Sequence, residues 1–274
     1  MTAFYFLETA NEVRFSVPCF VASEHTKIEK KKEIFYFDIS RISHVINRIR
    51  MYYLFLLIVV LVSLFNVVKS DPQPREMAPS FKAKAVFDDK FIDIKLSDYA
   101  SKNMWTVLLF YPYDYTFVCP TEIISFSSKN DEFQSLSTQV LAISTDSHHT
   151  HLAWTRSDRK NGGVGKLNIP LVADTSKQIS KSYGVLVEDE EDDMFGAALR
   201  GLFIIDPIGK IRSIQINDDA VGRNVEETLR ILKAFQWADS HEGEGCPASW
   251  TPGSDTIKTN PYESHDYFAK HFTE

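Results

Sequence analysis

The chain has 274 residues, of which 44% are hydrophobic and 24% are charged, and its formal net charge is −7. This composition is ordinary for a globular protein with a buried core, and the length allows one sizeable domain with extensions or two small domains. The negative charge argues against a nucleic-acid-binding protein, which carries a basic footprint. The three cysteines are too few for a disulfide scaffold, and none lies in a Cys-x-x-Cys pair. A zinc ribbon and a thioredoxin-type redox motif are therefore excluded.

The N-terminal part of the chain lacks a recognisable fold pattern until it reaches an apolar segment. Residues 1–50 show no sustained period and receive no predicted fold, and Cys19 lies there without obvious partners. Residues 51–68 form an uncharged, largely apolar stretch of 18 residues, preceded by Arg48 and Arg50. A charged region, an apolar region and polar residues afterwards are the parts of a secretory signal.

Two interpretations of this segment stay open, because a signal is expected at the start of a chain. In one, residues 51–70 are a signal peptide and Met51 is the true start, which predicts an endoplasmic-reticulum or secreted protein. In the other, the stretch is a signal-anchor helix, whose length is near the lower limit for a membrane span. A membrane-anchored or cytoplasmic location is the corresponding alternative.

The next segments alternate between strand and helix patterns. Residues 71–79 are polar and contain prolines, as in a linker, and a domain is predicted over 80–240. The apolar run 105–111 has strand length and is typical of a strand buried on both faces. A helix is predicted after it, with Ile123, Ile124, Phe126, Phe133 and Leu136 near one face. The following predicted elements are strands 140–144 and 169–172 and helices 147–159 and 176–183.

The last part of the domain predicts a hairpin and a long helix. Strands 202–205 and 211–216 flank a turn that contains Pro207 and Gly209. Apolar residues then recur with the helical period at Val225, Leu229, Leu232 and Phe235. Strand–helix alternation with a final hairpin and helix predicts an α/β sandwich with a mixed central sheet flanked by helices. Residues 241–274 turn polar and Gly/Pro-rich, which indicates a C-terminal arm with a short helix near 262–272.

Cys119 comes shortly after the buried strand and directly before Pro120. Proline suits the first position of a helix, so the cysteine is predicted at a helix N-terminus, where the helix dipole favours negative charge. The thiolate is the reactive form of a cysteine, and α/β sheets place their sites at the carboxyl ends of strands. Position alone leaves two interpretations open, a reactive nucleophile and a buried structural cysteine.

Longer motifs around this cysteine resemble those of a known family. The pattern Pro112-x-x-x-Thr116-x-x-Cys119 resembles the active-site motif of the peroxiredoxins, and residues 116–123 are similar to the typical two-cysteine subgroup. Further matches, in the same order along the chain, lie at 151–154, 162–165, 168–170, 200–206, 221–223 and 246–250. The resemblance covers residues 78–274 and, together with the apolar segment, is closest in type to secretory or endoplasmic-reticulum members.

The resemblance implies a thioredoxin-like fold and a thiol-dependent peroxidase that serves antioxidant defence and redox homeostasis. Cys119 would attack hydrogen peroxide or an organic hydroperoxide and become a sulfenic acid. Arg200 would hold the thiolate and donate hydrogen bonds to the peroxide oxygens, a task that suits its rigid, permanently charged guanidinium. Thr116 would exchange hydrogen bonds with the peroxide, and Pro112 would shield the thiolate from water. Glu122 and Arg223 would support the site by orienting the first arginine.

The third cysteine, Cys246, lies 127 positions after Cys119 in the predicted arm. From the residues alone it is either a free thiol or half of a static bridge. The resemblance implies a resolving cysteine, which forms an intersubunit disulfide with the Cys119 sulfenic acid and is recycled by thioredoxin or a similar dithiol. It also implies a homodimer and a ring of dimers such as a decamer. A one-cysteine peroxidase is disfavoured because Cys246 lies in its full motif.

The remaining patterns add no cofactor. Neighbouring His148 and His149 would point different ways on a helix, so no metal site is predicted. The acidic run 188–193 is typical of a solvated loop. An alternative function from another class is an oligomeric holdase chaperone or a peroxide-signalling sensor. No nucleic-acid partner is expected, and membrane contact is expected only if residues 51–68 remain as an anchor.

Overall fold

The computed structural model describes residues 8–9, 12–19, 31–64 and 71–272, and the chain divides into two compact units, residues 1–69 and 70–274. The first unit contains a three-stranded antiparallel sheet and one helix. Its elements are β1 (Glu8–Thr9), β2 (Glu12–Cys19), β3 (Lys31–Asp38) and α1 (Ile39–Leu64). Of the predicted signal segment 51–70, residues 65–70 lie outside the described residues. None of the helices in the described part has the length and apolar character that a membrane span requires.

The second unit contains the predicted domain and the arm. Its strands are β4 (Lys82–Phe87), β5 (Lys90–Lys95), β6 (Trp105–Phe110), β7 (Thr138–Ser144), β8 (Leu171–Ala173), β9 (Arg200–Ile205), β10 (Ile211–Asn217), β11 (Glu244–Gly245) and β12 (Ile257–Lys258). Its α-helices are α2 (Ser97–Ala100), α3 (Cys119–Ser128), α4 (Asn130–Ser135), α5 (His148–Arg156), α6 (Gln178–Ser182), α7 (Val225–Ser240) and α8 (Ser264–His271), with a 3-10 turn η1 (Arg159–Asn161).

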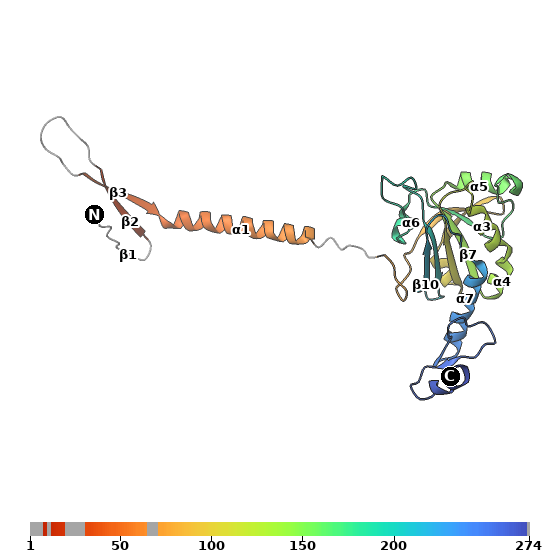
Figure 1. Cartoon of the computed structure of the whole chain (residues 1–274). Coiled ribbons are helices and arrows are strands. Elements are labelled where there is room, and N and C mark those ends of the chain that lie inside the picture. Colours follow the sequence, from red (N-terminus) through yellow and green to blue (C-terminus); the bar gives the residue numbers. More distant parts are fainter. Residues whose placement is uncertain (1–7, 10–11, 20–30, 65–70, 273–274) are drawn as a thin grey trace. The chain divides into compact units, whose positions relative to one another are not determined.

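Seven strands form the central sheet in the order β10-β9-β6-β7-β8-β4-β5. The pairs β6–β7 and β7–β8 are parallel, whereas β9 runs antiparallel to both β6 and β10. Helices lie on both sides of this sheet (Figure 1). The predicted α/β sandwich with a mixed central sheet is therefore confirmed, including the β9–β10 hairpin.

The central strand β6 explains why the sequence shows a continuous apolar run at this point. Its odd-numbered residues Trp105, Val107 and Leu109 join a core with α3, α5 and α7, while Leu108 and Phe110 join a second core on the other face. All six residues of the strand are buried. Because a strand presents alternate side chains to opposite faces, burial on both faces leaves no exposed position, and Thr106 is the one polar residue of the strand.

The structure differs from the sequence-based expectations in several places. Residues 1–50, for which no fold was predicted, contain β1–β3 and the beginning of α1. The single helix predicted after β6 is two helices, α3 and α4, because Lys129 has non-helical backbone angles (φ −96°, ψ 8°). The β4–β5 hairpin was not predicted. Its turn residues Asp88 and Asp89 both have positive φ (48° and 59°), as two-residue hairpin turns require. β4 begins with alternating Lys and Ala residues, and so it lacks the run of large apolar residues that predicts the other strands.

The segment predicted as a linker contacts the sheet. The amide of Arg75 donates to the carbonyl of Ile211 (2.7 Å), and the amide of Ile211 donates to the carbonyl of Glu76 (2.9 Å). Residues 75–76 are therefore hydrogen-bonded to the first residue of β10.

Candidate active site

Cys119 is the first residue of α3, and its side chain is fully buried. An eight-residue loop, 111–118, separates it from the carboxyl end of β6, and Pro120 occupies the first turn of the helix. Val118 supplies no capping side chain to the helix N-terminus. The sulfur therefore lies at a helix end that receives no side-chain cap, and Glu122 is the acidic residue of the first turn.

Arg200 supplies the cation beside this sulfur. It is the first residue of β9 and only 3% exposed. Its Nη1 lies 3.4 Å from Cys119 Sγ and donates to Glu122 Oε2 at 2.6 Å. Its Nε donates to the carbonyl of Asp219 at 2.6 Å, which fixes the other end of the guanidinium. The predicted contact between Cys119 and Arg200 is thus present, although 81 positions separate the two residues.

Glu122, one turn into α3, connects Arg200 to Arg223. Its Oε1 accepts hydrogen bonds from the Arg223 amide (2.6 Å) and Nε (2.7 Å), and its Oε2 accepts from Arg223 Nη2 (3.0 Å). Arg223 Nη1 also donates to the carbonyls of Phe110 and Gly201, both at 2.7 Å. Burial by itself would raise the pKa of Glu122, but the hydrogen bonds and charge of Arg223, together with Arg200, hold that pKa below its ordinary value. The buried carboxylate is therefore ionised and aligns both arginines.

The loop before Cys119 carries the other two predicted site residues. Pro112 is buried, and Thr116 is half-buried. The Thr116 hydroxyl donates to the carbonyl of Tyr113 at 3.0 Å. Its proton is thus directed to the loop backbone, which leaves the oxygen lone pairs available as acceptors.

Cys246 follows β11 and packs against α7 instead of α3. Its Sγ lies 3.6 Å from the carbonyl of Ala234, and the side chain borders a cavity of about 370 Å³ between α7 and the arm. Burial raises the pKa of the Cys246 thiol, and Arg230 opposes that shift. In the described part of the chain, Cys119 and Cys246 are both free thiols. Within one subunit the structure therefore does not pair them.

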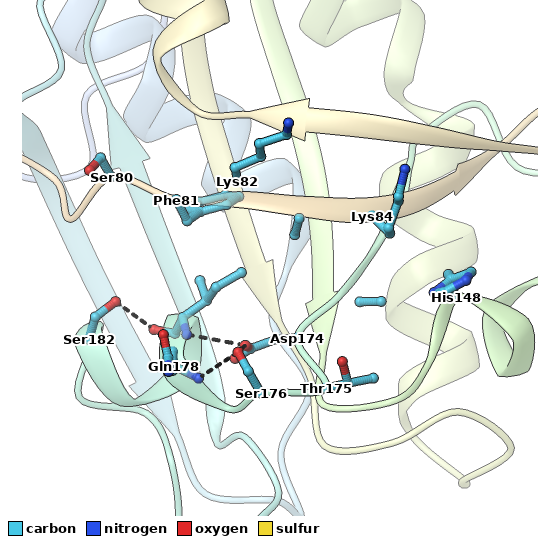
Figure 2. Close-up of a pocket in the computed structure, with 13 residues that line it drawn as sticks. Ser80, Phe81, Lys82, Lys84, His148, Asp174, Thr175, Ser176, Gln178 and Ser182 are labelled. Atoms are coloured by element: carbon cyan, nitrogen blue, oxygen red, sulfur yellow. Dashed lines mark hydrogen bonds between the residues drawn. The ribbon is translucent and has the colours of Figure 1, made fainter.

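A different cavity, of about 550 Å³, lies between β4 and α6 (Figure 2). The Asp174 carboxylate in it accepts from the amides of Ile179 and Ser180, while the side chains of Lys82 and Lys84 point away from that carboxylate. Neither the cysteines nor the predicted site arginines line this cavity. The chemistry-bearing groups therefore converge on Cys119 and not on this pocket.

Comparison of the chain with known proteins shows the family to which it belongs. The sequence model of the AhpC/TSA family matches residues 74–214, and the C-terminal domain of 1-Cys peroxiredoxin matches residues 234–270. Peroxiredoxin prdx-2 of Caenorhabditis elegans is 58% identical over 194 residues, which cover 71% of this chain and 92% of the relative. The chain belongs to the peroxiredoxin family.

Within that family, other relatives support assignment to the typical two-cysteine peroxiredoxins. The human mitochondrial thioredoxin-dependent peroxide reductase is 53% identical over 199 residues, covering 73% of this chain and 75% of the relative. The solved structure of reduced Plasmodium vivax 2-Cys peroxiredoxin superimposes with a TM-score of 0.67 at 37% identity, covering 72% of this chain and 98% of that one. This peroxiredoxin is accordingly an oxidoreductase with thiol-dependent peroxidase activity.

Proposed function

We propose that this peroxiredoxin reduces hydroperoxides with Cys119 as its nucleophile and Arg200 as the cation that stabilises the reacting charges. The observation that carries the proposal is the 3.4 Å approach of Arg200 Nη1 to a sulfur at a helix N-terminus. The Cys119 thiolate attacks one peroxide oxygen, so that an S–O bond forms and the O–O bond breaks. The second oxygen departs as hydroxide or alkoxide and takes up a proton from water. Cys119 is left as a sulfenic acid.

Cys246 completes the proposed cycle. Its thiolate attacks the sulfenic sulfur of a second subunit, the S–S bond forms, and the S–O bond breaks with release of hydroxide. The position of Cys246 against α7, in the polar arm, supports a partner from another subunit. A thioredoxin-like dithiol then reduces the disulfide by exchange. This assembly requires at least a homodimer, and we propose a ring of dimers.

Cysteine variants test both steps. Cys119→Ser is expected to abolish hydrogen peroxide consumption, while Cys246→Ser retains one oxidation per Cys119 but loses turnover with thioredoxin. On a non-reducing gel, wild-type protein treated with peroxide migrates as a covalent dimer and Cys246→Ser does not. Cys19→Ser is the matched control and keeps both properties. A covalent dimer in Cys246→Ser, or peroxide consumption by Cys119→Ser at the wild-type rate, overturns the mechanism.

The secretory location is a proposal that rests on residues 51–68 alone. The relatives named above include a mitochondrial enzyme and provide no support for secretion. Sequencing the N-terminus of the mature protein decides the question. A start shortly after residue 70 supports a cleaved signal, and a start at residue 1 contradicts it.

A further inference from the structure

The loop 111–118 carries Pro112 and Thr116 past the sulfur, yet it contains no helix or strand. Tyr115 within it adopts a left-handed conformation (φ 57°), which a non-glycine residue keeps only when its surroundings impose it. The Thr116 side chain bonds only to this loop's own backbone among the described contacts. Interactions from outside the loop must therefore set its position.

Asp114, midway between Pro112 and Thr116, supplies such an interaction with His151, in addition to a contact within the loop with Tyr111. Its Oδ1 accepts the hydroxyl of Tyr111 at 2.8 Å, and its Oδ2 lies 2.8 Å from His151 Nδ1. The side chains of Asp114 and His151 are both completely buried. Because a carboxylate only accepts, Nδ1 carries the proton and donates. The other ring nitrogen, Nε2, has no partner among the described residues, so the ring's polar contact is the one to Asp114.

A second carboxylate holds the backbone at the same residue. The amide of Asp114 donates to Asp146 Oδ2 at 2.9 Å, and that oxygen also accepts the hydroxyl of Ser144 at 2.8 Å. Ser144 ends β7, and His151 lies in α5. The loop is thus attached to the end of β7 and to the helix α5 that follows it, through groups 32 and 37 positions away in the sequence.

We propose that Asp114 and His151 are positioning residues for peroxide reduction. They fix the loop so that Pro112 and Thr116 lie at the right distance from Cys119. The inference rests on the proposed role of Cys119. Neither residue touches the sulfur or the peroxide; both act through the loop.

The energetics support this role over simple stabilisation. A buried carboxylate loses its hydration, and its partners at best offset that cost, so an apolar residue would serve stability equally well. What an apolar residue cannot do is fix the loop: each oxygen of the Asp114 carboxylate makes its own directional hydrogen bond, and together the two bonds hold this backbone segment in one place. Misplacement of a reacting group by about 1 Å costs on the order of 100-fold in rate.

Two reactions of the same thiol provide the test. The rate constant for Cys119 with hydrogen peroxide depends on the placement of Thr116 and Pro112, whereas alkylation by iodoacetamide needs only the thiolate and access to it, which a displaced loop does not reduce. In Asp114→Ala and His151→Ala we expect the peroxide rate constant to fall about 10- to 100-fold, with alkylation unchanged or faster. Asp114→Asn, which still accepts one hydrogen bond, is expected to recover most of the peroxide rate. Tyr111→Phe removes a single donor and keeps the measurement possible if an alanine variant does not fold.

Asp255→Ala is the matched control, because Asp255 also contacts a histidine (His271, 2.7 Å) but is exposed and lies in the arm. It should leave both rates unchanged. A wild-type peroxide rate in Asp114→Ala and Tyr111→Phe, or an equal fall of both reactions, overturns the positioning role. Failure of the proposed function is distinct: wild-type Cys119 would then react with peroxide no faster than an ordinary thiol.

Discussion

At the scale of single residues, Glu122 links helix α3 to both arginines of the site. Its two oxygens accept four hydrogen bonds, one from Arg200 and three from Arg223. Removing one partner of a buried ion pair leaves the remaining charges uncompensated, which costs about 3–5 kcal/mol. We therefore expect Glu122→Gln to lower the free energy of unfolding at pH 7 by about 3 kcal/mol. Peroxide reduction should fall as well, because Arg200 loses its alignment.

The same carboxylate predicts a pH dependence. The folded-state pKa of Glu122 is lowered, so its stabilisation is fully present above the ordinary glutamate pKa of about 4.3 and is lost as the pH falls through the lowered value. Urea unfolding at decreasing pH should therefore show the gap between wild type and Glu122→Gln closing below about pH 4. The control Glu132→Gln removes a one-third-exposed carboxylate and should show a small gap throughout. A gap for Glu122→Gln that stays constant as the pH falls contradicts this assignment.

At the scale of elements, the contact between α7 and the arm controls where Cys246 lies. Arg230 of α7 forms two hydrogen bonds with Glu227 (2.6 and 2.8 Å) and donates to the carbonyl of Trp250 in the arm at 2.9 Å. Trp250 itself is only 3% exposed. The arginine is thus held on its own helix and attaches the arm segment that contains the second cysteine.

Replacement of this arginine should loosen the arm without disturbing the Cys119 site. One such hydrogen bond contributes about 1 kcal/mol, which corresponds to about a fivefold change in a local opening equilibrium. In Arg230→Gln we expect amide hydrogen exchange over residues 246–258 to quicken by about that factor. The matched control, Arg156→Gln, removes an exposed pair with Asp89 and should leave that exchange unchanged. Unaltered exchange in Arg230→Gln would show that other contacts hold the arm.

At the scale of the whole molecule, all of the proposed chemistry lies in the second compact unit, residues 70–274. That unit has its own core on both faces of the seven-stranded sheet. A compact unit with its own core is expected to fold independently. A protein that begins at residue 71 should therefore melt within about 2 °C of the full chain's corresponding transition and keep its peroxide rate constant. Calorimetry and stopped-flow kinetics measure the two quantities, and a clear loss of either would show that the first 70 residues support the domain.

Local sequence patterns were sufficient for much of the fold and for the position of the proposed nucleophile at a helix start. The uninterrupted apolar run of β6, the turn between β9 and β10, and the period of α7 each follow from neighbours in the chain. Pro120 places Cys119 at a helix start by a local rule as well. The β4–β5 hairpin escaped prediction because its lysine-rich strand gains its burial from β8, an element far away in the sequence.

The sequence by itself determined which family the chain resembles and, through a motif whose members lie within eight positions, which residue we propose as the nucleophile. Only the tertiary structure decided which atoms of Glu122 bind each arginine and that Asp114 meets His151, because those contacts span 37 to 101 positions. Periodicity reports which face of an element is buried, but it does not report which buried polar group meets which. That pairing depends on the sheet order, since adjacent strands bring together the loops at their ends.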